Sequence, residues 1–512
     1  MRNVRVAVIG AGVGGLSAAV DLAARGADVT VVEAAATPGG KMRQVAINGA
    51  LLDAGPTVFT MRWVFEEIFR DAGAALESCL TLLPTEILAR HAWGGGERLD
   101  LHADIDRAAE AIGAFAGPRE AGAYRLFCDR ARRIYETLER PFIRSVRPTP
   151  VGLARNVGIG RLGDLWGIAP FTTLWRALGE HFSDPRLRQL FGRYATYCGS
   201  SPFMAPATLM LVAHVEREGV WFIEGGMHRL AVALARLAES KGARLRYATR
   251  AVEILVAAGR VSGLRLANGE QIAVDSVVVN ADTAALARGL LGAAVAKATP
   301  PTAPSERSLS ALTWNLVAPA QGFPLLRHNV FFSDDYSAEF HDIFRLRRLP
   351  LAPTIYVCAQ DRGETGGVTQ EQERLLCLVN APPTGDSGFP TAQEVEQCED
   401  RTFRFLDRCG LRIARRPEST QRTTPQDFAR MFPATGGALY GPSSHGWMAS
   451  FRRPGSRTHL PGLYLAGGSV HPGPGVPMAA LSGRLAAASL LQDFASTAGS
   501  RRMAMSGGIS TG

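Results

Sequence analysis

The sequence predicts an α/β fold in which a Rossmann-like dinucleotide-binding domain is closed by both ends of the chain. An apolar strand at Val4–Ile9 runs into a glycine-rich turn at Gly10–Gly15. A second apolar strand, Leu463–Ala466, is followed by a stretch with four glycines and three prolines. The small-residue helix Met478–Leu491 comes next. Glycine lets a backbone approach a bulky ligand, and a helix N-terminus offers free N–H groups. We therefore expect the two turns to serve one cofactor site.

The N-terminal turn lies within a complete βαβ unit. The segment Gly10–Gly15 (GAGVGG) opens the predicted helix Leu16–Arg25, and the next strand, Val29–Val32, ends in Glu33. A G-x-G-x-x-G pattern between a strand and a helix, followed by an acidic residue, is the context that a dinucleotide site requires. Glu33 can accept hydrogen bonds from both ribose hydroxyls, which favours FAD or NAD over a cofactor with a 2′-phosphate.

Further strands are predicted in the second half of the chain. Leu245–Val279 is expected to form a three-stranded meander with a hairpin turn at Asn268-Gly269, followed by an apolar strand ending at Asn280. Ser310–Asn380 alternates strands and loops and is expected to form a second sheet, whereas residues 70–215 show a helical, arginine-rich pattern.

The charge balance favours anionic surfaces. Lysine and arginine outnumber acidic residues by 56 to 47, a formal charge of +9. Because no arginine cluster is interleaved with aromatics as in nucleic-acid modules, we expect no nucleic-acid partner and favour a membrane surface. In Gly152–Phe182, Trp166, Phe171, Trp175 and Phe182 lie among arginines. This stretch suits either a segment dipping into lipid headgroups or an amphipathic lid helix facing the core.

Other classes of site and location are disfavoured. The seven cysteines form no C-x-x-C pair, which argues against disulfides, metal clusters and a redox pair, and no metal site is expected. The N-terminus begins with a strand instead of a signal peptide, and the longest apolar runs are too short to span a bilayer. We therefore expect a cytoplasmic protein, peripheral at the inner membrane surface.

Four further glycine-containing segments follow along the chain, and their order is more informative than any one of them. They are Pro38-Gly-Gly-Lys41, Asp53-Ala-Gly-Pro-Thr57, Glu224-Gly-Gly-Met227 and the C-terminal segment LYLAGGSVHPGPGVPMAALSG. Together they resemble the carotenoid (phytoene) desaturase family of FAD-dependent oxidoreductases, within the amine-oxidase-like group, from Arg5 to about Asp493. The chain departs from many members at Gly468-Ser-Val470, which leaves the glycines of the site unchanged.

This resemblance implies an FAD site with the following contacts. The pyrophosphate would be held by four glycines, Gly10, Gly12, Gly14 and Gly15. Glu33 would bind the adenosine ribose. Residues along the ribityl and isoalloxazine side would be Gly40, Lys41, Gly55, Pro56 and Thr57, and the adenine would face Val252. The pyrimidine end of the flavin would be cradled by Gly467, Gly468, Val476, Pro477 and Met478.

The resemblance also implies a division of the chain. An amine-oxidase-like FAD-binding domain, of the two-dinucleotide type shared with GDP-dissociation inhibitors, would comprise 1–70, 216–290 and 440–495. A helical, membrane-associating lid would cover 71–215, and a sheet-plus-helix substrate domain would cover 291–439. Residues 496–512, rich in arginine, serine and glycine, would form a disordered tail.

The implied chemistry is hydride abstraction from a lipophilic carotenoid, for which a flavin is a suitable acceptor. The catalytic base is not identified: His471 lies in a His-Pro turn that is more often structural, and Asp53 is expected to cap a turn. Without a second dinucleotide motif or a redox cysteine pair, oxygen or a membrane quinone is the expected electron acceptor.

Within the family, the C-terminal segment is most like bacterial enzymes that introduce a 3,4 double bond into 1-hydroxy acyclic carotenoids. A terminal tertiary hydroxyl would need a buried polar partner, which we expect in the second domain. Phytoene desaturation of the central chain, carotene isomerisation, amine oxidation and a flavin-free lipid carrier resembling GDP-dissociation inhibitors are the alternatives that the residues leave open.

Overall fold

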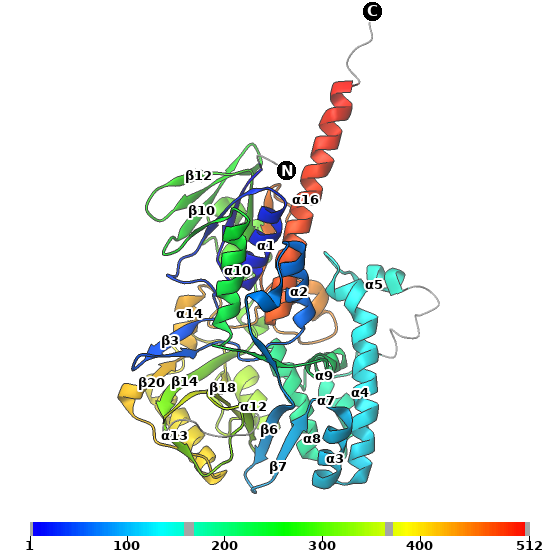
Figure 1. Cartoon of the computed structure of the whole chain (residues 1–512), viewed down its shortest axis with the longest axis vertical. Helices are drawn as coiled ribbons and strands as arrows, with labels where there is room; N and C mark the ends of the chain where they lie inside the picture. The colour runs from blue at the N-terminus through cyan, green and yellow to red at the C-terminus, as the bar shows by residue number, and fades with distance from the viewer. Residues whose placement is uncertain (1–3, 158–167, 364–371, 507–512) are drawn as a thin grey trace, which may run out of the picture.

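The computed structural model of the chain describes residues 4–157, 168–363 and 372–506 (Figure 1). Its first layer is a parallel five-stranded sheet with the order β21-β13-β1-β2-β9. The strands are β1 (Arg5–Ile9), β2 (Asp28–Val32), β9 (Arg244–Arg246), β13 (Ser276–Val279) and β21 (Leu463–Leu465). The first strand therefore lies at the centre, and a strand from near the C-terminus lies at one edge, as the two glycine turns predict.

Four helices, including the first and the last of the chain, pack beside this sheet. They are α1 (Val13–Ala24), α2 (Arg62–Asp71), α10 (His228–Ser240) and α16 (Val476–Ser506). Figure 1 shows α16 alongside α1 and α2, with its C-terminal end projecting from the body of the molecule. Arg484 joins the three helices, because its guanidinium pairs with Asp21 at 3.1 Å and with Glu67 at 3.4 Å.

The last helix is longer than the sequence predicts. It continues to Ser506, whereas we expected a disordered tail from Ser496. Arginine, methionine and alanine between 501 and 505 favour helix, and this preference outweighs the glycine and serine content of the stretch. Residues 507–512 of that predicted tail lie outside the described residues.

The predicted meander is confirmed. Its strands are β10 (Ala251–Ala257), β11 (Arg260–Leu266) and β12 (Gln271–Ala273), paired antiparallel. Two short antiparallel ribbons flank the domain: β3 (Gln44–Ile47) with β4 (Ala50–Asp53), and β5 (Leu82–Pro84) with β8 (Trp221–Ile223). The short helices nearby are α11 (Thr283–Ala287) and α15 (Ala449–Arg452).

The second layer is a seven-stranded sheet with the order β20-β14-β18-β17-β16-β6-β7. Five strands come from the predicted second sheet and its C-terminal continuation: β14 (Ser310–Ala318), β16 (His328–Phe332), β17 (Ile355–Ala359), β18 (Glu373–Ala381) and β20 (Thr420–Thr423). A small ribbon, β15 (Ala320–Gln321) with β19 (Arg412–Ile413), and the helices α12 (Tyr336–His341), α13 (Ala392–Arg408) and α14 (Pro425–Met431) accompany it.

The other two strands correct a prediction. We expected residues 71–215 to be helical, but β6 (Ile87–Trp93) and β7 (Arg98–His102) extend the seven-stranded sheet through parallel pairing of β6 with β16. In β6 most side chains on both faces are covered: His91 and Trp93 stack on Phe332 on one face, and Ala92 is buried on the other. Burial on both sides removes the polar alternation by which a strand is recognised in sequence.

The remainder of this region is helical. It contains α3 (Ile105–Ala116), α4 (Pro118–Leu138), α5 (Pro150–Val157), α7 (Leu174–His181), α8 (Pro185–Gly192) and α9 (Leu211–Arg217). Phe182 is fully buried against Phe127 and Phe191, and Trp175 packs on Phe203. Phe182 therefore belongs to the core, and the partly buried Trp175 packs against that core, whereas Phe171 is 63% exposed. Trp166 and residues 158–167 lie outside the described residues.

Asp53 joins the two layers. Its carboxylate accepts hydrogen bonds from Met227 N at 2.6 Å and His228 N at 3.4 Å, at the start of α10. Its backbone exchanges hydrogen bonds with the Gln360 side chain of the seven-stranded sheet, at 2.9 and 3.0 Å. Asp53 is therefore a buried structural cap, as expected. Among the described residues, no helix is both long and apolar enough to cross a membrane.

Candidate active site

A cavity of about 980 Å³ opens at the carboxyl ends of β1, β2 and β13 and extends toward the seven-stranded sheet. In parallel α/β sheets this edge is where ligands bind. The volume lies at the upper end of the range for ligand pockets, which suits a large ligand. All the predicted cofactor-binding residues line this cavity except Gly15 and Val252.

The N-terminal glycines leave no room for side chains. A Cβ on Gly14 would lie 2.6 Å from Asn280 Oδ1 and 2.9 Å from Gly467 N, and one on Gly12 would lie 2.7 Å from Asn280 Nδ2. Gly10 has a φ of +96°. Gly15 serves packing instead, because a Cβ there would lie 2.1 Å from the Gly10 carbonyl oxygen. Because these glycines have no side chains, the backbone N–H groups at the N-terminus of α1 face the cavity uncovered, as the binding of a pyrophosphate requires.

Glu33 lies at the end of β2 beside this turn. Its Oε2 accepts a hydrogen bond from Ala11 N at 2.7 Å, and its Oε1 accepts one from Ala35 N at 2.8 Å. The carboxylate is thereby held at the cavity wall with further lone pairs for ribose hydroxyls. Thr249 N donates to the Glu33 carbonyl at 2.7 Å, so residues 249–251 line the cavity. Val252, the second residue of β10, does not line the cavity.

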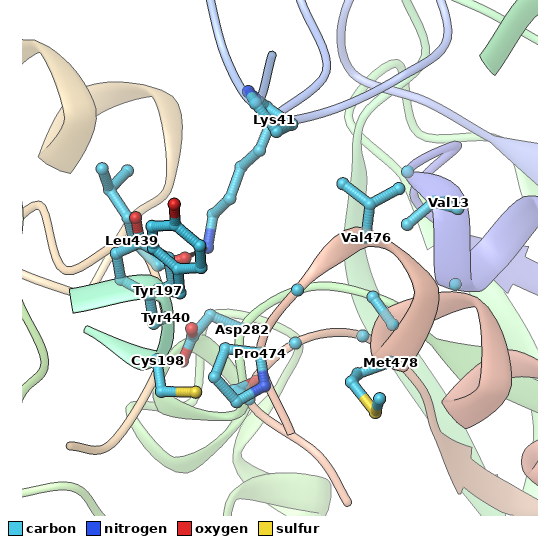
Figure 2. Close-up of a pocket in the computed structure, with 18 of the residues that line it drawn as sticks. Val13, Lys41, Tyr197, Cys198, Asp282, Leu439, Tyr440, Pro474, Val476 and Met478 are labelled. Atoms are coloured by element: carbon cyan, nitrogen blue, oxygen red, sulfur yellow. Dashed lines mark hydrogen bonds between the residues drawn. The ribbon is translucent and has the colours of Figure 1, made fainter. Parts of the chain in front are cut away.

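The C-terminal glycines and α16 form the next part of the wall. Gly467, with a φ of +107°, donates its N–H to Ser482 Oγ at 2.7 Å. Val476, Pro477 and Met478 begin α16, whose first N–H groups have no intrahelical acceptor. Figure 2 shows Val476 close to Val13, so the first turns of α16 and α1 face the same space. The residues present therefore fit a dinucleotide that spans both helix N-termini.

Lys41 reaches from the Pro38–Lys41 loop across the cavity. Its Nζ donates to the Leu439 carbonyl and lies 5.2 Å from the centre of the Phe432 ring. Burial lowers the pKa of Lys41, an effect that Asp282 opposes and Arg453 reinforces. Figure 2 shows the lysine beside Tyr197 and Tyr440, where the cofactor end of the cavity meets its aromatic end.

The aromatic end carries a small polar cluster in mostly apolar surroundings. Arg193 Nη1 donates to the Tyr197 hydroxyl at 2.9 Å, and its guanidinium carbon lies 5.5 Å from the centre of the Tyr356 ring. The Tyr356 hydroxyl is 2.6 Å from Thr57 Oγ1 and 2.7 Å from His328 Nδ1. Burial raises the pKa of Glu216 nearby, although Tyr194, Tyr197 and Arg193 oppose this.

His471 has a structural role. Its Nε2 is 2.9 Å from the Phe142 carbonyl and its ring packs edge-on against Phe142, whereas the following proline lines the cavity. Burial lowers the pKa of His471 to about 4, so the ring is neutral near pH 7. This agrees with the structural interpretation of the His-Pro turn.

Two supporting residues were not identified from the sequence. Asn280 directly follows β13, donates to the Gly10 carbonyl at 3.3 Å and lies against both glycine turns. Its position at the carboxyl end of a central strand is the signal that could have identified it. Arg453 donates to the Gly468 carbonyl at 3.1 Å and the Tyr440 carbonyl at 3.2 Å. No local pattern marks this arginine, because its partners are distant in sequence.

Comparisons with known proteins agree with this geometry. Residues 13–491 match the family described as flavin containing amine oxidoreductase. The chain is 58% identical over 512 residues to hydroxyneurosporene desaturase from Rubrivivax gelatinosus, covering 100% of this chain and 98% of that protein. It is 48% identical to hydroxyneurosporene desaturase from Cereibacter sphaeroides, with 96% and 98% covered. An oxidoreductase from Methanosarcina mazei has a similar fold, with a TM-score of 0.60, 15% identity and 94% and 99% covered.

Fold and site together define an FAD-dependent oxidoreductase. The chain belongs to the flavin containing amine oxidoreductase family and, within it, to the carotenoid desaturases. The family assignment made from the glycine motifs is therefore confirmed, as is FAD as the cofactor.

Proposed function

We propose that this enzyme introduces the 3,4 double bond into 1-hydroxy acyclic carotenoids such as 1-hydroxyneurosporene. The observation that carries this proposal is one continuous cavity, which runs from the two glycine turns to a wall of aromatic and aliphatic side chains. Full-length identity of 58% to a hydroxyneurosporene desaturase supports the same substrate class. If the end of a carotenoid lay against the aromatic and aliphatic wall, its terminal carbons would be beside the part of the cavity that would hold the flavin.

The bound flavin supplies a hydride acceptor for the C–H bond beside the polyene. We propose that it is held by the glycines and loop residues named from the sequence, with Glu33 on the ribose and Thr249–Ala251 beside the adenine in place of Val252. The free N–H groups at Val476 and Met478 would stabilise negative charge on the ring, because a helix N-terminus carries partial positive charge. The apolar wall excludes water from the reacting carbons.

We further propose that the cavity mouth docks on a bilayer. Phe171 and Trp447 both line the cavity and are 63% and 42% exposed, with ring centres 5.2 Å apart. On the neighbouring α5, Val151 is 81% exposed. Exposed aromatics beside a hydrophobic cavity suit extraction of a membrane-dissolved substrate, and the net charge of +9 suits anionic headgroups. A membrane quinone or oxygen would then reoxidise the flavin.

Product spectra test the proposed reaction. The FAD-loaded full chain is incubated with liposomes that carry 1-hydroxyneurosporene, and carotenoid absorbance is followed with and without a quinone. Because each added conjugated double bond moves carotenoid absorbance to the red, the expected result is a red-shifted product. An unchanged carotenoid spectrum with flavin-loaded enzyme would contradict the proposed function.

A further inference from the structure

We propose that Arg193 and Tyr336 form the recognition site for the terminal hydroxyl of the substrate, and so determine which carotenoid end is desaturated. This inference rests on the proposed function. It assigns roles to two residues in the aromatic end of the cavity that the binding of FAD does not require.

The first observation concerns unused hydrogen-bonding capacity. Tyr336 begins α12, is 4% exposed and lines the cavity, and its hydroxyl has no hydrogen-bond partner among the described residues. An unpaired buried hydroxyl costs stability, so native proteins rarely keep one without a reason. A hydroxyl group of a ligand would satisfy it.

The second observation concerns Arg193, whose charge acts on Tyr336 and opposes the effect of burial on the pKa of its hydroxyl. Arg193 lines the same cavity and donates from Nη1 to Tyr197. Among the described residues the carboxylate of Glu216 acts on its charge without forming an ion pair with it. A guanidinium has five N–H donors, so several remain for a ligand. Burial opposes this charge, but Tyr197, Glu216 and Tyr356 favour it, so that the pKa of Arg193 is raised. The charged donor is thus maintained in an apolar cavity.

The third observation is the position of Arg193 relative to the cofactor side of the cavity. Arg193 lies 5.0 Å from the centre of the Tyr197 ring and 5.5 Å from that of Tyr356, and the Tyr356 hydroxyl is 2.6 Å from Thr57. Thr57 belongs to the loop proposed to run along the isoalloxazine. The cluster is therefore next to the place where hydride transfer would occur.

This position agrees with the geometry of the substrate. In a 1-hydroxy carotenoid, only C1 and C2 separate the hydroxyl oxygen from C3, the nearer carbon of the new double bond. A group that holds the hydroxyl must therefore lie close to the hydride acceptor. We assign Arg193 as the donor to the hydroxyl oxygen and Tyr336 as the acceptor of its hydrogen. An end without the hydroxyl would leave the Tyr336 hydroxyl unpaired and the remaining N–H donors of Arg193 without an acceptor.

The test compares two substrates on FAD-loaded full-length enzymes: 1-hydroxyneurosporene and neurosporene, which lacks the hydroxyl. The ratio of their kcat/KM values is measured for the wild type, Tyr336→Phe and Arg193→Met. We expect each substitution to lower the preference for the hydroxylated substrate by about 10- to 100-fold. Tyr336→Phe should leave the melting temperature unchanged or higher, because it removes an unpaired hydroxyl.

Tyr124→Phe is the matched control. Tyr124 is 4% exposed and stacks on Phe191, but it does not line the cavity, so its loss should leave the substrate ratio unchanged. A folded Tyr336→Phe variant that keeps the wild-type preference would overturn the inference. A wild type that desaturates both substrates equally well would overturn it too, while the desaturase activity stands. A flavin-loaded wild type that desaturates neither would instead contradict the proposed function.

Discussion

Gly483 of the last helix lies directly against Gly14 of the first: a Cβ added to Gly483 would be 2.0 Å from the Gly14 carbonyl oxygen. Two segments from opposite ends of the chain thus pack backbone to backbone at the dinucleotide site. Because Gly14 and Gly467 also meet there, the two glycine turns form one structural unit. The cofactor site therefore depends on the closure of both termini.

The substitution Gly483→Ala tests this dependence. The added methyl group meets backbone atoms that cannot rotate away, so α1 and α16 must separate, at a cost of about 1–3 kcal/mol. We expect a lower melting temperature and loss of flavin on gel filtration. Gly122→Ala in α4 is the control, because a Cβ there meets nothing within 4 Å. Full flavin retention by Gly483→Ala would argue against closure by both termini.

Glu33→Gln tests the assignment of the ribose contact. The substitution preserves shape but removes the charge, and hydrogen bonds to a charged group are worth about 1.5–3 kcal/mol. We expect the dissociation constant for FAD, measured by flavin fluorescence, to rise at least about tenfold. Glu253→Gln on β10, outside the cavity lining, should leave it unchanged. Equal affinities for the two variants would place the ribose elsewhere.

Buried histidines predict sensitivity to acid. Burial lowers the pKa of His91 and His328 to about 3 and of His445 and His471 to about 4. In the unfolded chain a histidine pKa is about 6.5, so between pH 6.5 and 4 unfolding takes up protons. The free energy of unfolding should therefore fall as the pH falls through this window. Above about pH 6.5 these histidines should add almost no further pH dependence to it.

A single variant isolates this effect. His91 lies outside the cavity lining, with its Nδ1 3.3 Å from the Leu99 carbonyl, a contact that glutamine can replace. In His91→Gln, denaturant unfolding at several pH values should show a shallower loss of stability between pH 6.5 and 4, by about one proton per molecule. The same pH slope in variant and wild type would show that His91 is not buried in its neutral form.

The proposed membrane contact predicts a change in lipid binding. Replacing Phe171 and Trp447 together with serine removes the exposed aromatics at the cavity mouth. We expect flotation with anionic liposomes to weaken by about tenfold, because the two rings lose apolar contact with the bilayer. Leu126→Ser is the control, since Leu126 is 65% exposed on α4 but not at the cavity. An equal loss of liposome flotation in both variants would show that lipid binding does not depend on the cavity mouth.

The sequence was most informative where local pattern and chemistry coincide. The glycine turn at Gly10–Gly15 and the strand before Glu33 predicted the central βαβ unit, because glycine spacing and apolar strands report directly on backbone geometry. The meander was likewise predicted through its Asn268-Gly269 turn. Most of the residues named for the cofactor line one cavity.

The sequence was least informative where contacts between distant segments determine the structure or the role of a residue. Strand β6 lacks polar alternation because most of its side chains on both faces are covered, and Phe182 resembles a membrane aromatic until its neighbours are known. Asn280 and Arg193 have neighbours in the site that are far away in the chain, Gly10 and Tyr356, so local spacing does not show their roles. Long-range polar contacts are therefore the part of the site that required the structure.

The most direct test of the account is a single turnover without oxygen or quinone. FAD-loaded enzyme is mixed with 1-hydroxyneurosporene in liposomes, and flavin and carotenoid absorbance are recorded together. We expect the flavin to bleach as the carotenoid shifts to the red, with one flavin reduced for each double bond formed. Carotenoid product without flavin reduction, or flavin reduction without product, would contradict hydride transfer from the carotenoid to the flavin.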